Sequence, residues 1–131
     1  MNNCFILLAA GQSKRFKSSK HKQFISYKNK PLYEHSIIKA IESKLFKKII
    51  LVTNNKKIDV KKFKNKIKII KGGKERSDSS FLGIKYAKKL GAKNVFIHDA
   101  ARPNFSINLL KNISKSLKTN QAVVPFINSS D

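Results

Sequence analysis

A single cysteine in 131 residues excludes a framework of intramolecular disulfides. No apolar run is long enough to span a bilayer, and no basic segment precedes the first apolar run as it would in a secretory signal. We therefore expect a cytoplasmic protein in which Cys4 is a buried thiol. Repeats, linkers and low-complexity tails are also lacking, which favours one folded domain over residues 1–131.

Acidic residues are scarce, because 7 of them stand against 29 lysines and arginines and leave a formal net charge of +22. Such an excess suits nucleic acid or an anionic membrane surface. The lysines are scattered, however, and few aromatic rings lie beside them on which bases could stack. The abundant Lys and Asn are typical of solvated surfaces encoded by an A/T-biased genome. We expect no specific nucleic-acid partner and no membrane partner, with a sequence-independent nucleic-acid binder as an alternative.

Apolar runs alternate along the chain with segments of helical periodicity. This alternation predicts an α/β fold, a Rossmann-like three-layer sandwich with a mostly parallel sheet covered on both faces. Helices are expected after Pro31, before Gly91 and over residues 109–117. Strands are expected over residues 4–9, 48–52, 66–70, 94–98 and 122–126.

Ligands of such sheets bind beyond the carboxyl ends of the strands, so the segments that follow the strands are the candidates for a site. Three of them combine small or charged residues. Each alone is compatible with a plain turn, and Asp99 alone could cap one. Their joint position at one edge of the sheet indicates a phosphate-binding site. The segments are LAAGQSKRF at 8–16, GGKERSDS at 72–79 and HDAARP at 98–103.

Nucleotidyl transfer is the chemistry that needs this set of groups. Breaking the α–β bond of a nucleoside triphosphate builds negative charge on nonbridging oxygens and on pyrophosphate, and cations, backbone N–H groups and a metal-holding carboxylate stabilise it. Arg15 and Lys22 can supply the cations, residues 10–13 the backbone donors, and Asp99 the metal-holding carboxylate. The P-loop pattern GxxxxGK[ST] and the dinucleotide pattern GxGxxG are both absent.

The combination of motifs resembles the 2-C-methyl-D-erythritol 4-phosphate cytidylyltransferase family of the non-mevalonate isoprenoid pathway. The three segments above contribute to the resemblance, as do KQF at 22–24, LYEHSI at 32–37 and AVVP at 122–125. These pieces follow the family's order and spacing over the whole chain, and HDAARP and GGxxRxxS are the most specific of them. The resemblance implies transfer of a cytidylyl group from CTP to a polyol phosphate, with Mg²⁺ as cofactor.

The resemblance also implies roles for individual residues. Arg15 and Lys22 would be catalytic, because they would stabilise the pentacovalent transition state. Asp99 would contact the ribose and the Mg²⁺-bound phosphates. Arg76 and Arg102 would brace loops, and His98 is expected to be a satisfied strand-end residue rather than a base. The nucleotide-binding residues would be Leu8, Ala9, Ala10, Gly11, Gly73, Ser79, Asp99 and Ala100.

Members of this family continue well past the position at which the sequence stops. We therefore expect the chain to be a CTP-binding nucleotidyltransferase domain that is truncated relative to the family, and a homodimer only if the family's C-terminal arm is present. Two alternatives stay open. One is a ribitol-5-phosphate cytidylyltransferase, and the other is a nucleotide-binding fragment without catalysis.

Overall fold

A sheet of four parallel strands forms the centre of the computed structural model, which describes residues 2–9 and 26–124. Its order is β5-β4-β1-β6, so β1 lies inside the sheet and β5 and β6 lie at its edges. The four expected strands of residues 4–98 are confirmed to within one residue at each end. They are β1 (Asn3–Leu8), β4 (Lys48–Val52), β5 (Ile67–Ile70) and β6 (Asn94–Asp99).

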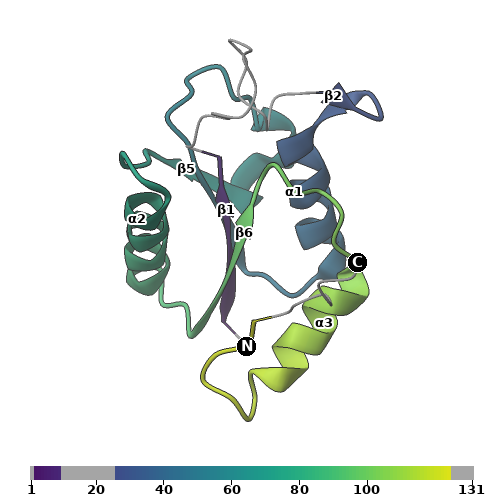
Figure 1. Cartoon of the computed structure of the whole chain (residues 1–131), viewed down its shortest axis with the longest axis vertical. Coiled ribbons are helices and arrows are strands. Elements are labelled where there is room, and N and C mark those ends of the chain that lie inside the picture. The colour runs from purple at the N-terminus through teal and green to yellow at the C-terminus, as the bar shows by residue number, and fades with distance from the viewer. Residues whose placement is uncertain (1, 10–25, 125–131) are drawn as a thin grey trace, which may run out of the picture.

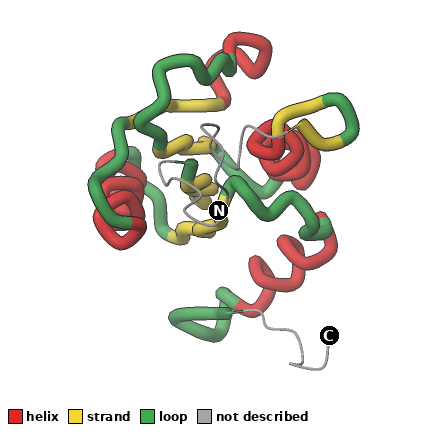
Figure 2. Tube along the Cα trace, turned by 45° about the horizontal axis from the view of Figure 1, so that its top comes forward, coloured by secondary structure: helices red, strands yellow, loops and turns green. Residues whose placement is uncertain are grey.

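Helices cover both faces of this sheet (Figures 1 and 2). Helix α2 (Arg76–Lys89) packs on one face, and α1 (Leu32–Ser43) and α3 (Ile107–Ser116) cover the other. Successive side chains of a strand point to opposite faces, so β1 divides its residues between two apolar cores. Phe5 and Leu7 lie in the core under α1 and α3, and Ile6 lies in the core under α2. The expected three-layer α/β sandwich is confirmed.

The ends of α2 and α3 follow from their sequences. Ser106 is the N-cap of α3, and its hydroxyl accepts a hydrogen bond of 3.0 Å from the backbone of Leu109. Gly91 follows α2 with a φ of 86°, a conformation that glycine adopts without steric cost. Gly91 matches the expected end of α2, whereas α3 begins at Ile107, two residues before the expected start at Leu109. None of the helices that the structure describes is long and apolar enough to cross a membrane.

Two short elements were not anticipated. A two-stranded hairpin joins β2 (Ser26–Tyr27) to β3 (Lys30–Pro31) through Lys28 and Asn29, which both have positive φ. The 3-10 helix η2 (Lys61–Lys66) is attached to α1 by an ion pair, in which Lys62 Nζ lies 2.7 Å from Oε1 of the buried Glu34. Elements this short carry no detectable periodicity in a sequence.

The strand expected over residues 122–126 is not supported in its described part. Residues 122–124 form no strand, and Val124 is exposed, while the remainder of that segment lies outside the described residues. Cys4, by contrast, is a buried free thiol as expected, and burial raises its pKa.

Helix α2 approaches β1 closely at Gly83. A Cβ atom at this position would lie 2.7 Å from Cγ2 of Ile6, a side chain with no exposed surface. Since a contact this short cannot be kept, α2 would have to move away from the sheet. Only glycine permits the observed spacing between these two elements.

We predict that Gly83→Ala lowers the free energy of unfolding. Overpacking costs about 1–3 kcal/mol, and at a contact of 2.7 Å we expect this cost to exceed the gain of about 1 kcal/mol that alanine brings to a helix. Urea unfolding followed by circular dichroism measures the difference. Ser77→Ala, at an exposed position of α2, is the matched control and should change the free energy by less than about 0.5 kcal/mol. A more stable Gly83→Ala protein would contradict the close contact.

Candidate nucleotide site

The carboxyl ends of β1 and β6 lie next to each other, because Leu8 is paired with Asp99 in the parallel register. The backbone continues this pairing beyond the strands. Ala9 donates a hydrogen bond from its N–H to the Val52 carbonyl at 2.8 Å, and Ala100 donates one to the Leu8 carbonyl at 2.9 Å. Four of the predicted nucleotide-binding residues are therefore neighbours at the end of the sheet where the strands have their carboxyl ends. We call this end of the sheet the C-terminal edge.

The amides of Ala9 and Ala100 are already used by the sheet. Both residues are buried, and their N–H groups are bonded as described above. A phosphate at this edge would therefore need its backbone donors from residues that follow Ala9. The predicted donors Ala10 and Gly11 lie outside the described residues, as do the predicted catalytic residues Arg15 and Lys22, so their roles stay predictions.

Asp99 begins a tight turn at the end of β6. Its Oδ1 accepts a hydrogen bond of 2.9 Å from the N–H of Ala101, and its carbonyl accepts one of 3.0 Å from the N–H of Arg102. The carboxylate is half-buried. Among the residues that the structure describes, the other carboxylate oxygen, Oδ2, accepts no hydrogen bond. Asp99 thus caps a turn, as the alternative interpretation allowed, and its role in binding a ligand stays a prediction.

A second segment of the edge connects β5 to α2. Gly73 donates its N–H to the hydroxyl of Ser79 at 3.1 Å, and Ser79 is buried in the first turn of α2. A Cβ on Gly73 would lie 2.4 Å from Cβ of Asp78, so this position requires glycine. The helix begins with a capping box between Glu75 and Asp78. The hydroxyl of Ser79 therefore holds the loop at Gly73 against the first turn of α2.

The segment after β4 was not predicted as part of the site, although it holds this edge together. Thr53 is buried, and it donates its N–H to the Ile70 carbonyl at 3.0 Å and its hydroxyl to the Ala9 carbonyl at 3.3 Å. Asn54 accepts a hydrogen bond of 3.1 Å from the N–H of Gly72. The available signal was a polar Thr-Asn-Asn sequence directly after a buried strand.

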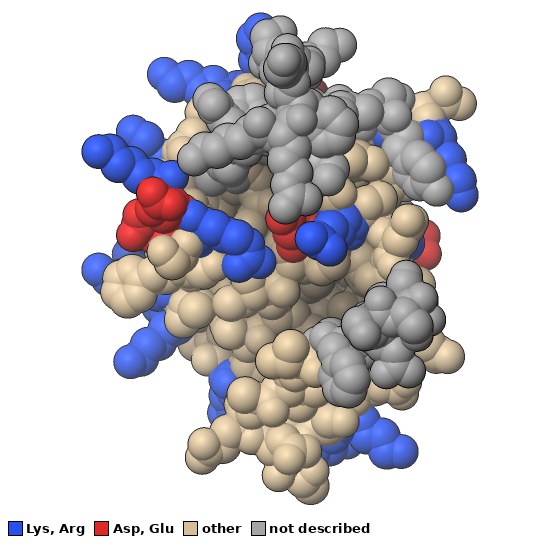
Figure 3. All heavy atoms as spheres, viewed as in Figure 1, with Lys and Arg blue, Asp and Glu red and all other residues tan. Residues whose placement is uncertain are grey.

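Charge at this edge comes from few described groups. Arg76 and Arg102 are both exposed, and among residues 2–9 and 26–124 no side-chain contact assigns either of them a bracing role, so that role stays a prediction. No group of three His, Cys, Asp or Glu side chains within residues 2–9 and 26–124 could hold a metal ion. Figure 3 shows basic side chains spread around one face of the molecule, without a single continuous band.

His98 precedes Asp99 and points to the opposite face of the sheet, because neighbouring residues of a strand alternate. Its Nε2 lies 2.5 Å from the Arg102 carbonyl, which can only accept, so Nε2 carries the proton. Burial lowers the pKa of His98 from its ordinary value of 6.5, and the cations Arg102 and Lys39 lower it further. The hydrogen bond to Arg102 and the charge of Asp99 oppose this shift. His98 is a satisfied strand-end residue, as expected.

Comparison with known proteins places these observations in a family. A sequence model described as IspD, 2-C-methyl-D-erythritol 4-phosphate cytidylyltransferase, matches residues 3–131. The bifunctional enzyme IspD/IspF of Pelagibacter ubique is 50% identical over 133 residues, which cover 100% of this chain and 36% of that protein. A 2-C-methyl-D-erythritol 4-phosphate cytidylyltransferase of Clostridium botulinum strain Langeland is 41% identical, over 84% of this chain and 51% of its own length.

Solved structures show the same fold. The bifunctional IspDF of Campylobacter jejuni superposes with a TM-score of 0.71 at 32% identity, over 89% of this chain and 31% of that chain. The 2-C-methyl-D-erythritol 4-phosphate cytidylyltransferase of Thermus thermophilus gives a TM-score of 0.76 at 20% identity, over 100% of this chain and 57% of that chain. The chain spans about half or less of the length of its Pelagibacter and Clostridium relatives.

We predict that the free energy of unfolding decreases as the pH falls below 6.5. The lowered pKa means that the unfolded chain binds a proton at His98 before the folded chain does, so the loss begins near 6.5 and ends below the folded pKa. His98→Gln keeps a donor for the Arg102 carbonyl and should flatten this dependence. Urea unfolding between about pH 7.5 and pH 5 measures it. His35→Gln is the control, and an unchanged slope in His98→Gln would contradict the assignment.

Proposed function

The chain belongs to the IspD family of 2-C-methyl-D-erythritol 4-phosphate cytidylyltransferases, and we propose that it forms the CTP-binding part of such an enzyme. The reaction transfers the cytidylyl group of CTP to 2-C-methyl-D-erythritol 4-phosphate in the non-mevalonate isoprenoid pathway. A phosphate oxygen of the acceptor forms a bond to the α-phosphorus of CTP while the bond to the β-phosphate breaks. The electron pair of that bond leaves with pyrophosphate.

The pairing of Leu8 with Asp99 is the observation that carries this proposal. It sets the start of the LAAGQSKRF segment beside a half-buried carboxylate. A cationic loop next to one carboxylate suits a metal-bound triphosphate, because the loop neutralises the phosphates and the carboxylate holds the metal. In this proposal the nucleotide lies across the edge formed by Leu8, Ala9, Gly73, Asp99 and Ala100, and Ala10 and Gly11 complete it.

Asp99 is the residue proposed to hold Mg²⁺. Mg²⁺ commonly binds through one or two carboxylates together with the phosphates of a substrate and several waters. Asp99 fits this mode of coordination, because its Oδ2 accepts no hydrogen bond from the described residues. A site in which protein side chains supply all of the Mg²⁺ ligands is not expected. When bound, the ion would neutralise charge that develops on the phosphates.

Arg15 and Lys22 are proposed to stabilise the transition state. Their positive charges would meet the negative charge that develops on the nonbridging oxygens of the α-phosphate and on the departing pyrophosphate. Because such an interaction strengthens only as the reaction proceeds, its loss should lower turnover more than nucleotide affinity.

We also propose a location, a mode of polyanion binding and an oligomeric state for the protein. We place the protein in the cytoplasm, which the free buried thiol of Cys4 favours. We expect polyanions to bind only non-specifically and in a salt-dependent way. We also expect a homodimer where the rest of the family's chain is present.

We predict that Lys22→Ala leaves the Kd for Mg·CTP within about threefold of the wild type, since uniform binding is retained. Where the rest of the family's chain is present, the rate of cytidylyl transfer should fall by about 10²–10³, as it does when one preorganised donor is removed. Calorimetry gives the affinity, and pyrophosphate release gives the rate. Lys17→Ala is the control of equal charge and should behave like the wild type.

The same assay decides the acceptor. Transfer to ribitol 5-phosphate in preference to 2-C-methyl-D-erythritol 4-phosphate would favour the sibling enzyme. CTP binding without pyrophosphate release in the presence of either acceptor, in a protein that carries the rest of the family's chain, would indicate a nucleotide-binding protein without catalysis. Equal losses of binding and transfer in Lys22→Ala would contradict the transition-state role.

We predict that Asp99→Asn abolishes the Mg²⁺-dependent part of CTP affinity, a loss of about tenfold. The amide oxygen can still accept from Ala101, so the turn is kept. Calorimetric titration of CTP with and without Mg²⁺ measures the effect. Asp59→Asn is the matched control, because Asp59 Oδ1 also accepts from a backbone N–H two residues later, at 3.0 Å. An Mg²⁺ effect that persists in Asp99→Asn would contradict the assignment.

A further inference from the structure

The segment after Asp99 is fastened to the rest of the molecule from the side of α1. Two successive carbonyls of this segment accept short hydrogen bonds. Lys39 Nζ, from α1, donates to the Pro103 carbonyl at 2.5 Å, and His98 Nε2 donates to the Arg102 carbonyl at 2.5 Å. We call residues 100–105 the β6 loop.

The end of the β6 loop is fixed by the same two side chains. Phe105 is buried, and its ring lies 4.5 Å from the His98 ring in a T-shaped arrangement. Lys39 Nζ lies 5.0 Å from the centroid of the Phe105 ring, within the range of a cation–π contact. The Lys39 ammonium therefore contacts the β6 loop twice, at a carbonyl and at a ring.

These contacts lie on the opposite side of β6 from Asp99. His98 and Asp99 are successive residues of one strand, so their side chains point to opposite faces of the sheet. The carbonyls of the β6 loop are held on the α1 side, and the N–H group of Ala101 is held by the Asp99 carboxylate. A displacement of the loop at Pro103 would therefore be transmitted to the Asp99 turn.

We propose that Lys39, together with His98, is a positioning residue of the nucleotide site, which acts by clamping the β6 loop so that the Asp99 carboxylate keeps its orientation. Lys39 does not contact the nucleotide in this arrangement. The inference rests on the proposed function of the Asp99 edge. It extends that function to a lysine of α1 that none of the motifs predicted.

If Lys39 had a purely structural role, its variants would behave differently. If the side chain served only to pack against Phe105, methionine would replace it, because methionine has a similar length and no charge. If the clamp matters, the donor is needed, and arginine should restore it because its guanidinium can donate to a carbonyl and lie over a ring.

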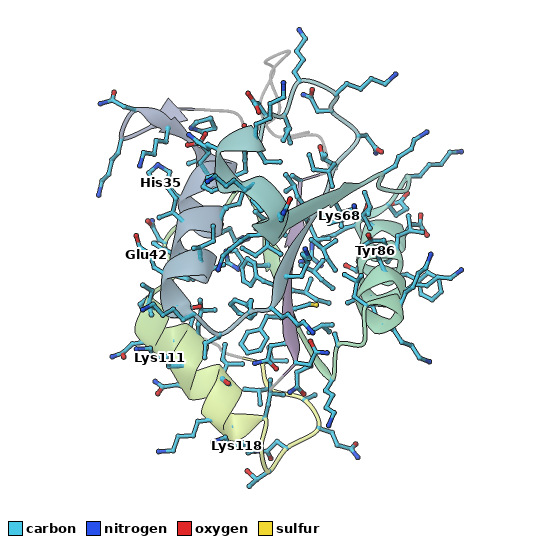
Figure 4. The ribbon with its side chains drawn as sticks, turned by 180° about the vertical axis from the view of Figure 1, so that it is seen from behind. His35, Glu42, Lys68, Tyr86, Lys111 and Lys118 are labelled. Atoms are coloured by element: carbon cyan, nitrogen blue, oxygen red, sulfur yellow. The ribbon has the colours of Figure 1, made fainter. Side chains whose placement is uncertain are left out.

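The test compares Lys39→Met with Lys39→Arg, and uses Lys111→Met as the control for loss of one charge. Lys111 lies at the outer surface of α3, where it is exposed (Figure 4). Hydrogen exchange at the N–H of Ala101, followed by NMR, reports on the turn without any nucleotide. Calorimetric titration with Mg·CTP reports on the site, and urea unfolding reports on stability.

We expect exchange at Ala101 to become about tenfold faster in Lys39→Met, and the Kd for Mg·CTP to rise about tenfold, as for loss of one charge-assisted hydrogen bond. Lys39→Arg and Lys111→Met should stay within about threefold of the wild type in both measurements.

An unchanged Kd and unchanged exchange in Lys39→Met, whatever its stability, would overturn the clamp. Equal losses of affinity in Lys39→Met and Lys111→Met would overturn it too, because the effect would then be one of net charge. A wild-type protein that does not bind Mg·CTP would instead overturn the proposed function. In that case the exchange at Ala101 alone would decide whether the clamp exists.

Discussion

The parallel pairing of β1 with both of its neighbours is the constraint on which the rest of the structure depends. Every residue of β1 is buried, and the strand lies between β4 and β6 with all three running in one direction. Their carboxyl ends must therefore meet at one edge. Residues from 8–9, 53–54 and 99–100 come together there although they are far apart in the sequence. The candidate site is a consequence of burying one apolar strand.

Burial of β1 also explains which polar groups of this edge remain for a ligand. The amides of Ala9 and Ala100 and the hydroxyl of Thr53 complete the sheet's own hydrogen bonds. The hydroxyl of Ser79 serves the Gly73 loop. Because leaving a buried polar group without a hydrogen bond is costly, these groups form hydrogen bonds within the sheet and its loops. In the proposed nucleotide site, backbone donors for a polyphosphate would come from the cationic segment that follows Ala9, where the sequence concentrates small residues.

Strands and helices could be predicted because they obey strong local rules. The runs 4–9 and 49–52 are apolar without interruption, and Gly91 and Pro31 mark helix ends. The hairpin at Lys28 and Asn29 could not be predicted, since two-residue strands show no alternation and lysine seldom has a positive φ. Residues 122–124 have the composition of a strand, but β-propensity depends on a pairing partner, and the described part of the chain offers them none. The meeting of the strand ends at Leu8 and Asp99 was predictable from the parallel order of the strands, whereas the roles of these residues stay predictions. Thr53 was missed because one threonine after a strand is not a motif.

The contacts of β6 show why a formal charge of +22 says little about the site by itself. Charge acts on a ligand through position, and most lysines are exposed, where water and salt screen them. Lys39 is different, since it is half-buried, and burial and the nearby charge of Lys28 lower its pKa. A cation that is partly removed from water must be compensated, and the Pro103 carbonyl and the Phe105 ring provide that compensation. The same contacts fix the loop that carries the Asp99 turn. The contacts that compensate the partly buried charge of Lys39 on the α1 side of the sheet are thus the contacts proposed to orient the Asp99 carboxylate on the other side.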